Sequence, residues 1–147
     1  ELGDPNAIQG PVFMAPRLGD SDYGAIVQTD RDKTTFWFDG KKLLDADFAV
    51  GGSLSPRGAK IISMFPPVFG PNGLVFIQVF TTQGTEILVY DHRGFSTVLA
   101  SGDRINGREL GMIIFGALPH CINSYGDLVC VADFVDGESS ILLGRAV

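Results

Sequence analysis

Hydrophobic residues in this chain come in short bursts, and polar or turn-forming residues separate one burst from the next. The bursts are rich in Val, Ile and Phe, are bounded by Gly, Asp, Asn or Pro, and show almost no helical periodicity. This pattern predicts an all-β chain of about a dozen short strands joined by tight turns. LVFIQVF at residues 74–80 is almost continuously apolar, which is typical of a strand covered on both faces. TEILVY at 85–90 and TTFWF at 34–38 are similar.

Three landmarks recur in the same order along the chain, with a period of roughly 50 residues. The first is a Gly-rich joint, LGDPNAIQGP, VGGSLSPRGA or ASGDRINGRE, and the second is a turn that ends in Gly before an apolar strand. The third is a turn after an aromatic or aliphatic strand, FWFDGKK, VYDHRGF or ILLGRAV. The joint glycines are Gly3, Gly51 and Gly102, and the glycines of the second landmark are Gly24, Gly73 and Gly126.

Four strands in a unit of about 50 residues are typical of a β-propeller blade. We therefore predict a propeller-like array of three four-stranded blades at about 1–48, 49–100 and 101–147, forming a single repeat domain. The joint at 100–109 is not predicted to bind phosphate, because such a loop needs a following helix and a Lys at a fixed place. RINGREL leads instead into the apolar strand GMIIFGAL.

The two ends of the chain look like parts of one missing strand. In the second unit Gly94 begins the last strand, the third unit is predicted to reach the same point at Gly144, and ELGD at the start resembles the end of that strand. Three blades are too few to close a ring, because propellers have about four to eight. The chain is therefore predicted to form a homo-oligomer or to belong to a longer repeat protein. The predicted seam comprises Glu1, Leu2, Gly3, Asp4, Arg145, Ala146 and Val147.

Composition restricts the partners. Of the 147 residues 45% are hydrophobic and 19% charged, which is a globular composition, and the net charge is −6. The Lys and Arg residues are scattered, so neither a nucleic-acid surface nor an anionic membrane surface is predicted. Because no apolar run approaches the roughly 18 residues of a spanning helix, no membrane span is predicted.

The segment TVLASGDRINGRELGMIIFGALPHCINSYGDLVCVADF, residues 97–134, resembles a class of bacterial tandem-repeat proteins with an Asn-x-x-Gly-x-x-Ala-Phe motif. The matched features are the Leu-Ala-x-x-Gly-Asp joint and the residues Asn123, Gly126 and Asp127. Proteins of this class are often secreted and anchored at the cell surface. The resemblance implies a propeller-like protein, extracellular or at the cell surface, and it supplies neither a reaction nor catalytic residues.

The two cysteines flank the turn INSYGDLV. Pairing Asn123 with Leu128 across this turn would place Cys121 directly opposite Cys130, with Cα atoms about 4.5 Å apart, at the short end of disulfide geometry. A disulfide between them and a pair of buried thiols are both compatible with the sequence. Tyr23 and Tyr125 occupy equivalent turns and are candidates for exposed contacts.

Other candidate chemistry is weak in this sequence. Asp20, Asp22, Asp30 and Asp32 lack the further ligands of a calcium loop, so turn formation explains them better. His92 and His120 have no zinc-ligand spacing. We predict no cofactor, metal or catalytic residue, and the recurring aromatic residues are predicted to pack between blades. The carboxylates from which a glycosidase pair could be drawn are Asp39, Asp45, Asp47, Asp91, Asp133 and Asp136.

The function predicted from these observations is that of a non-catalytic extracellular module for self-assembly or recognition. A carbohydrate-binding propeller is the first alternative, and a glycosidase-type enzyme is the second.

Overall fold

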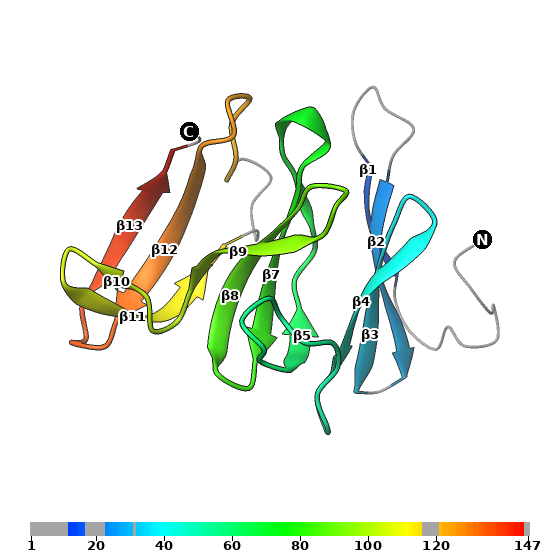
Figure 1. The fold of residues 1–147 in the computed structure, drawn as a ribbon, viewed down its shortest axis with the longest axis horizontal. Coiled ribbons are helices and arrows are strands. Elements are labelled where there is room, and N and C mark those ends of the chain that lie inside the picture. Colours follow the sequence, from blue (N-terminus) through cyan, green and yellow to red (C-terminus); the bar gives the residue numbers. More distant parts are fainter. Residues whose placement is uncertain (1–11, 17–22, 31, 116–120, 146–147) are drawn as a thin grey trace.

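The structure is a computed structural model that describes residues 12–16, 23–30, 32–115 and 121–145. It confirms the all-β prediction: the strands form three antiparallel sheets that lie in a row, with the middle sheet between the other two (Figure 1). The three sheets draw their strands from separate stretches of the chain, 12–47, 61–100 and 104–144. The finer predictions, that these stretches are repeat units and that each sheet is a blade of a propeller, stay predictions.

The first sheet is a meander in which each strand pairs with the next one in sequence. Asp39 and Gly40, between the last two strands, have φ values of 50° and 71°. This pair of positive angles matches a two-residue hairpin turn of the primed type, for which Asp-Gly is a preferred sequence. The strands are β1 (Val12–Pro16), β2 (Tyr23–Asp30), β3 (Lys33–Phe38) and β4 (Lys41–Asp47).

The middle sheet has the order β5-β7-β8-β9, and the two-residue strand β6 also pairs with β7. A short 3-10 turn, η2 (Pro71–Gly73), leads into β7. The strands are β5 (Ile61–Met64), β6 (Val68–Phe69), β7 (Val75–Thr81), β8 (Gly84–Tyr90) and β9 (Phe95–Ala100).

The third sheet has the order β10-β11-β12-β13, so that β13 is its edge strand within the described chain. Asn106 and Gly107, with φ values of 52° and 79°, form the turn between its first two strands. The strands are β10 (Arg104–Ile105), β11 (Arg108–Ile114), β12 (Leu128–Phe134) and β13 (Ser139–Gly144).

The predicted fourth-strand position of Gly144 is wrong. Gly144 pairs with Leu128 and closes β13, whereas Gly94 in the middle sheet lies in the turn that follows β8. The residue of the middle sheet that corresponds to Gly144 is therefore Tyr90, which pairs with Val75. The two glycines look equivalent in sequence because each follows an apolar strand, but Gly144 belongs to the last pair of its hairpin and Gly94 comes after the last pair of its own.

Two hydrophobic clusters hold the three sheets together. One lies between the first and middle sheets and includes Phe36, Phe38 and Leu88. The other lies between the middle and third sheets and includes Ile87 and Ile113. The middle sheet thus contributes side chains to both clusters, one from each face.

The strand β7 confirms the prediction from LVFIQVF. Val75, Ile77 and Val79 belong to the first cluster, Phe76 belongs to the second, and Gln78 is buried among them. Because successive residues of a strand point to opposite faces, both faces of β7 are covered.

Candidate functional site

The third sheet exposes an apolar face on the side away from the middle sheet. In β12, Leu128, Cys130 and Ala132 are buried, whereas the alternate residues Val129 and Val131 are exposed. The same alternation in β11 and β13 aligns exposed residues across the strands, since Val131 pairs with Ile114 on one side and with Ile141 on the other. We call this set the outer face: Met112, Ile114, Val129, Val131, Ile141 and Leu143.

The middle sheet provides a reference for the outer face, because β7–β8 and β12–β13 are matching hairpins. Each hairpin begins two residues after a glycine with positive φ, Gly73 before Val75 and Gly126 before Leu128. The first residue of β7 pairs with Tyr90, and that of β12 pairs with Gly144. Counting from these pairs, the counterparts of Val129, Val131, Ile141 and Leu143 are Phe76, Gln78, Ile87 and Val89.

These counterparts lie beneath the third sheet. Ile87 is 0% exposed and Phe76 is 5% exposed, whereas Ile141, at the position of Ile87, is 75% exposed. The two hairpins therefore present side chains at equivalent positions, and only the one in the middle sheet has a neighbouring sheet on that side within the described chain. Large exposed apolar patches mark interaction sites.

Hydrogen bonds as well as apolar packing hold the interface between the middle and third sheets. The Gln78 side-chain amide donates to the carbonyl oxygen of Ile113 over 2.8 Å, and its Oε1 accepts the N–H of Phe115. The Thr85 hydroxyl accepts the N–H of Ile113 over 2.9 Å. The pairing of β11 with β12 is irregular between Leu110 and Ile113. Side chains of the middle sheet therefore form hydrogen bonds with backbone N–H and carbonyl groups at this end of β11. At the position of Gln78 the outer face has Val131, which can offer packing but no such bonds.

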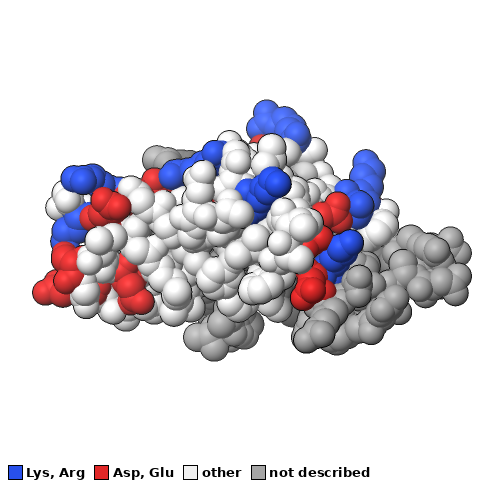
Figure 2. All heavy atoms as spheres, turned by 90° about the horizontal axis from the view of Figure 1, so that it is seen from below, with Lys and Arg blue, Asp and Glu red and all other residues white. Residues whose placement is uncertain are grey.

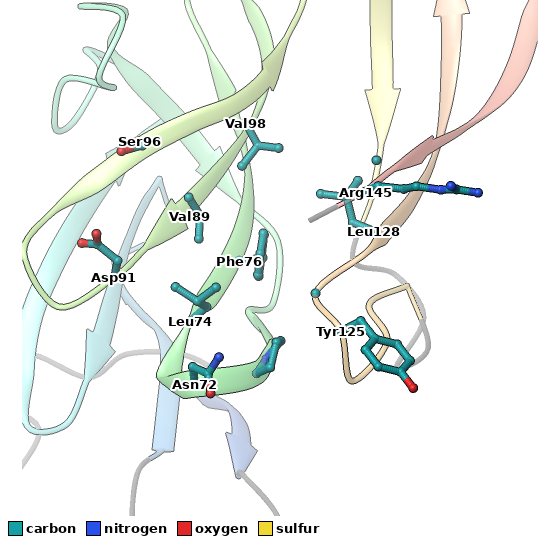
Figure 3. A pocket seen from close by; sticks show the side chains of 13 residues that line it. Asn72, Leu74, Phe76, Val89, Asp91, Ser96, Val98, Tyr125, Leu128 and Arg145 are labelled. Carbon is teal, nitrogen blue, oxygen red and sulfur yellow. The ribbon is translucent and has the colours of Figure 1, made fainter. Parts of the chain in front are cut away.

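A cleft of about 510 Å³ opens between the middle and third sheets (Figure 3). Aliphatic and aromatic side chains line its two walls, with Val89 and Val98 on one side and Leu128 on the other. The side chains of Tyr125 and Arg145 belong to the rim and point away from the space between the sheets. The cleft therefore suits apolar side chains better than a polar ligand. The other lining residues are Pro71, Asn72, Leu74, Phe76, Asp91, Ser96, Gly126 and Gly144.

The predicted pairing around the cysteines is wrong by one residue. Ile122 pairs with Leu128, the N–H of Val129 donates to the carbonyl oxygen of Cys121, and the N–H of Asn123 donates to that of Asp127. The tighter turn forms because Asn123 Oδ1 accepts the N–H groups of Tyr125 and Asp127. Val129 rather than Cys130 consequently lies opposite Cys121.

Cys121 and Cys130 are both buried in the second cluster, and the structure has them as thiols. Burial raises the pKa of the Cys130 thiol, and the nearby Cys121 adds to the rise. The disulfide remains a prediction, but it no longer has the directly opposed strand positions on which the expectation was based.

Cys130 should react with iodoacetamide at pH 8 at least about tenfold more slowly in the native chain than in the chain unfolded in urea. The reason is that the thiolate is the nucleophile and that burial disfavours the thiolate. Both cysteines lie in the tryptic peptide 109–145, so tandem mass spectrometry, which fragments that peptide between them, measures the rate at Cys130. The same measurement without reductant detects a disulfide as a mass lower by two hydrogens. Equal rates in the native and unfolded chains would contradict the buried thiol.

The other candidate residues fall in several places. Tyr125 is 81% exposed in the turn before β12, and Arg145 is exposed directly after β13. The backbone of Tyr23 begins β2. The remaining predicted seam residues, Glu1 to Asp4 with Ala146 and Val147, lie outside the described residues, as do His120, Asp20 and Asp22.

The carboxylates considered for a catalytic pair mostly serve turns and surface ion pairs. Asp91 accepts the N–H groups of Arg93 and Gly94, and these contacts lower its pKa. Asp136 has its pKa lowered by the Arg108 guanidinium, which also contacts Glu138. His92 packs against the rings of Phe38 and Tyr90. Over residues 12–16, 23–30, 32–115 and 121–145 no group of three His, Cys, Asp or Glu side chains is placed to hold a metal.

In Figure 2 charged side chains of both signs are mixed toward each end of the row of sheets, and further Lys and Arg side chains lie between these two groups. At the end formed by the third sheet, the ion pairs of Arg108 with Asp136 and Glu138 account for part of this mixture. In the described part of the chain, no helix is long and apolar enough to cross a membrane.

Sequence reasoning did not identify the outer face, although a signal for it exists. LVCVADF carries apolar residues at consecutive positions, as LVFIQVF does, and such a run predicts cover on both faces.

Comparison of the chain with family models, with curated proteins and with solved structures finds no match.

Proposed function

We propose that this chain is a non-catalytic, propeller-like assembly module that adds a further sheet of the same kind on the outer face. The observation that carries the proposal is the equivalence of the two hairpins. The third sheet covers the middle sheet through Phe76, Ile87 and their neighbours, and the outer face presents Val129 and Ile141 at the same positions.

The fold supports a propeller-like arrangement. Each sheet is antiparallel, and the three sheets pack face to face in sequence order (Figure 1). Stacked repeats of this kind contact only their neighbours, so an uncovered terminal face is a place for another repeat. The extracellular location implied by the resemblance at residues 97–134 is part of the same proposal.

The free energy of burying apolar surface favours a packed outer face over one exposed to water. Burial of apolar surface contributes about 25 cal/mol per Å², so a few hundred Å² gives several kcal/mol before the costs of association and side-chain ordering. The face is aliphatic, and no lysine, arginine, aspartate or glutamate is among its six members. Asp133, the next residue of β12 on this side, pairs with Ser139 and accepts a hydrogen bond from its hydroxyl, so a charge lies at the margin of the face and not among its six members.

The carbohydrate-binding alternative receives less support. A sugar site needs polar groups that converge on a ligand, and the exposed aromatic ring at the rim of the cleft, Tyr125, points away from it (Figure 3). The glycosidase alternative would need two carboxylates that face a common cavity. Among the lining residues of the cleft Asp91 is the one carboxylate, and it is engaged in its own turn.

Val131→Lys should weaken self-association of the chain at least about tenfold, because it places a charge at the centre of an apolar interface. Val135→Lys is the matched control, since Val135 is exposed in the turn after β12 and lies outside the outer face. Sedimentation equilibrium at increasing concentrations measures the effect. A wild-type chain that stays monomeric at hundreds of micromolar, or a Val131→Lys chain that associates as well as the control, would contradict the proposal.

A further inference from the structure

Within the described residues, one edge of the third sheet lacks a strand that the other two sheets have. In the first sheet β4 lies beyond β3, and in the middle sheet β9 lies beyond β8. The matching strand of the third sheet is β13, and in the described chain no strand lies beyond it. The extra strand of this sheet, β10, is at the opposite edge and spans two residues. An unpaired edge presents a row of backbone donors and acceptors.

The side chains of β9 show the consequence of that missing strand. In β4, the edge strand of the first sheet, Leu44 and Ala46 are buried in the cluster shared with the middle sheet. In β9 the side chain of Val98 is 40% exposed, and Ser96 is exposed. Each sheet covers the one before it, but the third sheet covers β9 only in part: Leu99 packs against the second cluster, and Val98 and Ser96 stay exposed.

The cleft joins these two features. Ser96 and Val98 of β9 line it on one side, and Gly144 at the end of β13 lines it on the other. It is continuous with the interface between the middle and third sheets, because Phe76 and Leu128 belong both to the cleft lining and to the second cluster.

We propose that the edge of β13 and the cleft bind an extended β-strand of another repeat of this kind. The strand pairs antiparallel with β13, as β9 does with β8, and its alternate apolar side chains fill the cleft. In the middle sheet the corresponding aromatic residue is Phe95, which packs against the cluster shared with the first sheet. This inference rests on the proposed function, since it names the second contact that an added repeat makes, and it uses different residues from the outer face.

The probe is a synthetic peptide of residues 94–103, GFSTVLASGD, added to the full 147-residue chain. Hydrogen–deuterium exchange of the amides of residues 139–144 should slow when the peptide is added, because main-chain hydrogen bonds supply the binding in strand addition. A peptide with Phe95→Asp is the control and should give at least about tenfold weaker protection, because it places a carboxylate in an apolar cleft.

Two protein variants separate this inference from the proposed function. Val98→Lys should abolish peptide protection and only partly weaken self-association, because the outer face is unchanged. Val131→Lys should weaken self-association through the outer face and leave peptide protection at the wild-type level. Val98→Ser is the second cleft variant, and circular dichroism verifies that each variant is folded. Lack of protection at 139–144 with a saturating peptide, protection at another edge, or undiminished protection in both folded Val98 variants would overturn the inference. If Val131→Lys loses self-association but the peptide does not protect residues 139–144 in any chain, this inference fails and the proposed function stands.

Discussion

Ile87→Ala should lower the free energy of unfolding by about 2–5 kcal/mol, which is the cost of removing a fully buried aliphatic side chain and leaving a cavity. Ile141→Ala should lower it by less than about 0.5 kcal/mol, the usual limit for a surface substitution. The two residues hold equivalent positions in matching hairpins, and one is 0% and the other 75% exposed. The difference thus isolates the contribution of a neighbouring sheet.

Urea unfolding followed by circular dichroism measures both variants. The chain should be dilute, at about one micromolar, so that outer-face contacts between chains do not add to the stability of Ile141. At high concentration the Ile141→Ala chain should lose the part of its apparent stability that association supplies. Equal losses for Ile87→Ala and Ile141→Ala in dilute solution would show that the outer face is already covered in the single chain.

The strands could be predicted from the sequence because their pattern is local. An apolar run such as LVFIQVF specifies a strand that is covered on both faces, and β7 is one. Turn residues are equally local: Asp39-Gly40 and Asn106-Gly107 both have the pairs of positive φ angles for which these dipeptides are suited. Fold class and turn positions follow from such short-range chemistry.

Register could not be predicted as well, because it depends on how a turn closes. The pairing across 121–130 differs by one residue from the expectation, since the Asn123 side chain accepts two backbone N–H groups and tightens the turn. A shift of one residue changes which side chains face each other, and it removed the direct opposition of the two cysteines. Gly144 was misplaced because the sequence pattern does not show that this residue still belongs to the β12–β13 hairpin, whereas Gly94 follows the end of the β7–β8 hairpin.

Exposure depends on tertiary contacts, which a pattern within one strand does not contain. Val131 and Gln78 hold equivalent positions, yet their burial differs because, among the residues that the structure describes, only Gln78 has a neighbouring sheet on its side. The sequence did contain a signal for the covered interface. Gln78 is the single amide in the apolar run LVFIQVF, and a buried amide needs hydrogen-bond partners in the adjacent structure.

Gln78→Leu should cost about 2–5 kcal/mol in the free energy of unfolding, although it replaces a polar side chain in the core with an apolar one of similar size. The change leaves the Ile113 carbonyl and the Phe115 N–H without the amide that now satisfies both. Since an unsatisfied buried group loses its water without gaining a partner, the missing bonds outweigh the added apolar surface.

The matched control is Gln83→Leu in the exposed β7–β8 turn, which should change stability by less than about 0.5 kcal/mol. Urea unfolding compares the two variants, and amide exchange should become faster at Phe115, whose N–H loses its acceptor, before it does so in β7. If Gln78→Leu is as stable as Gln83→Leu, the packing of the clusters alone holds the middle and third sheets together.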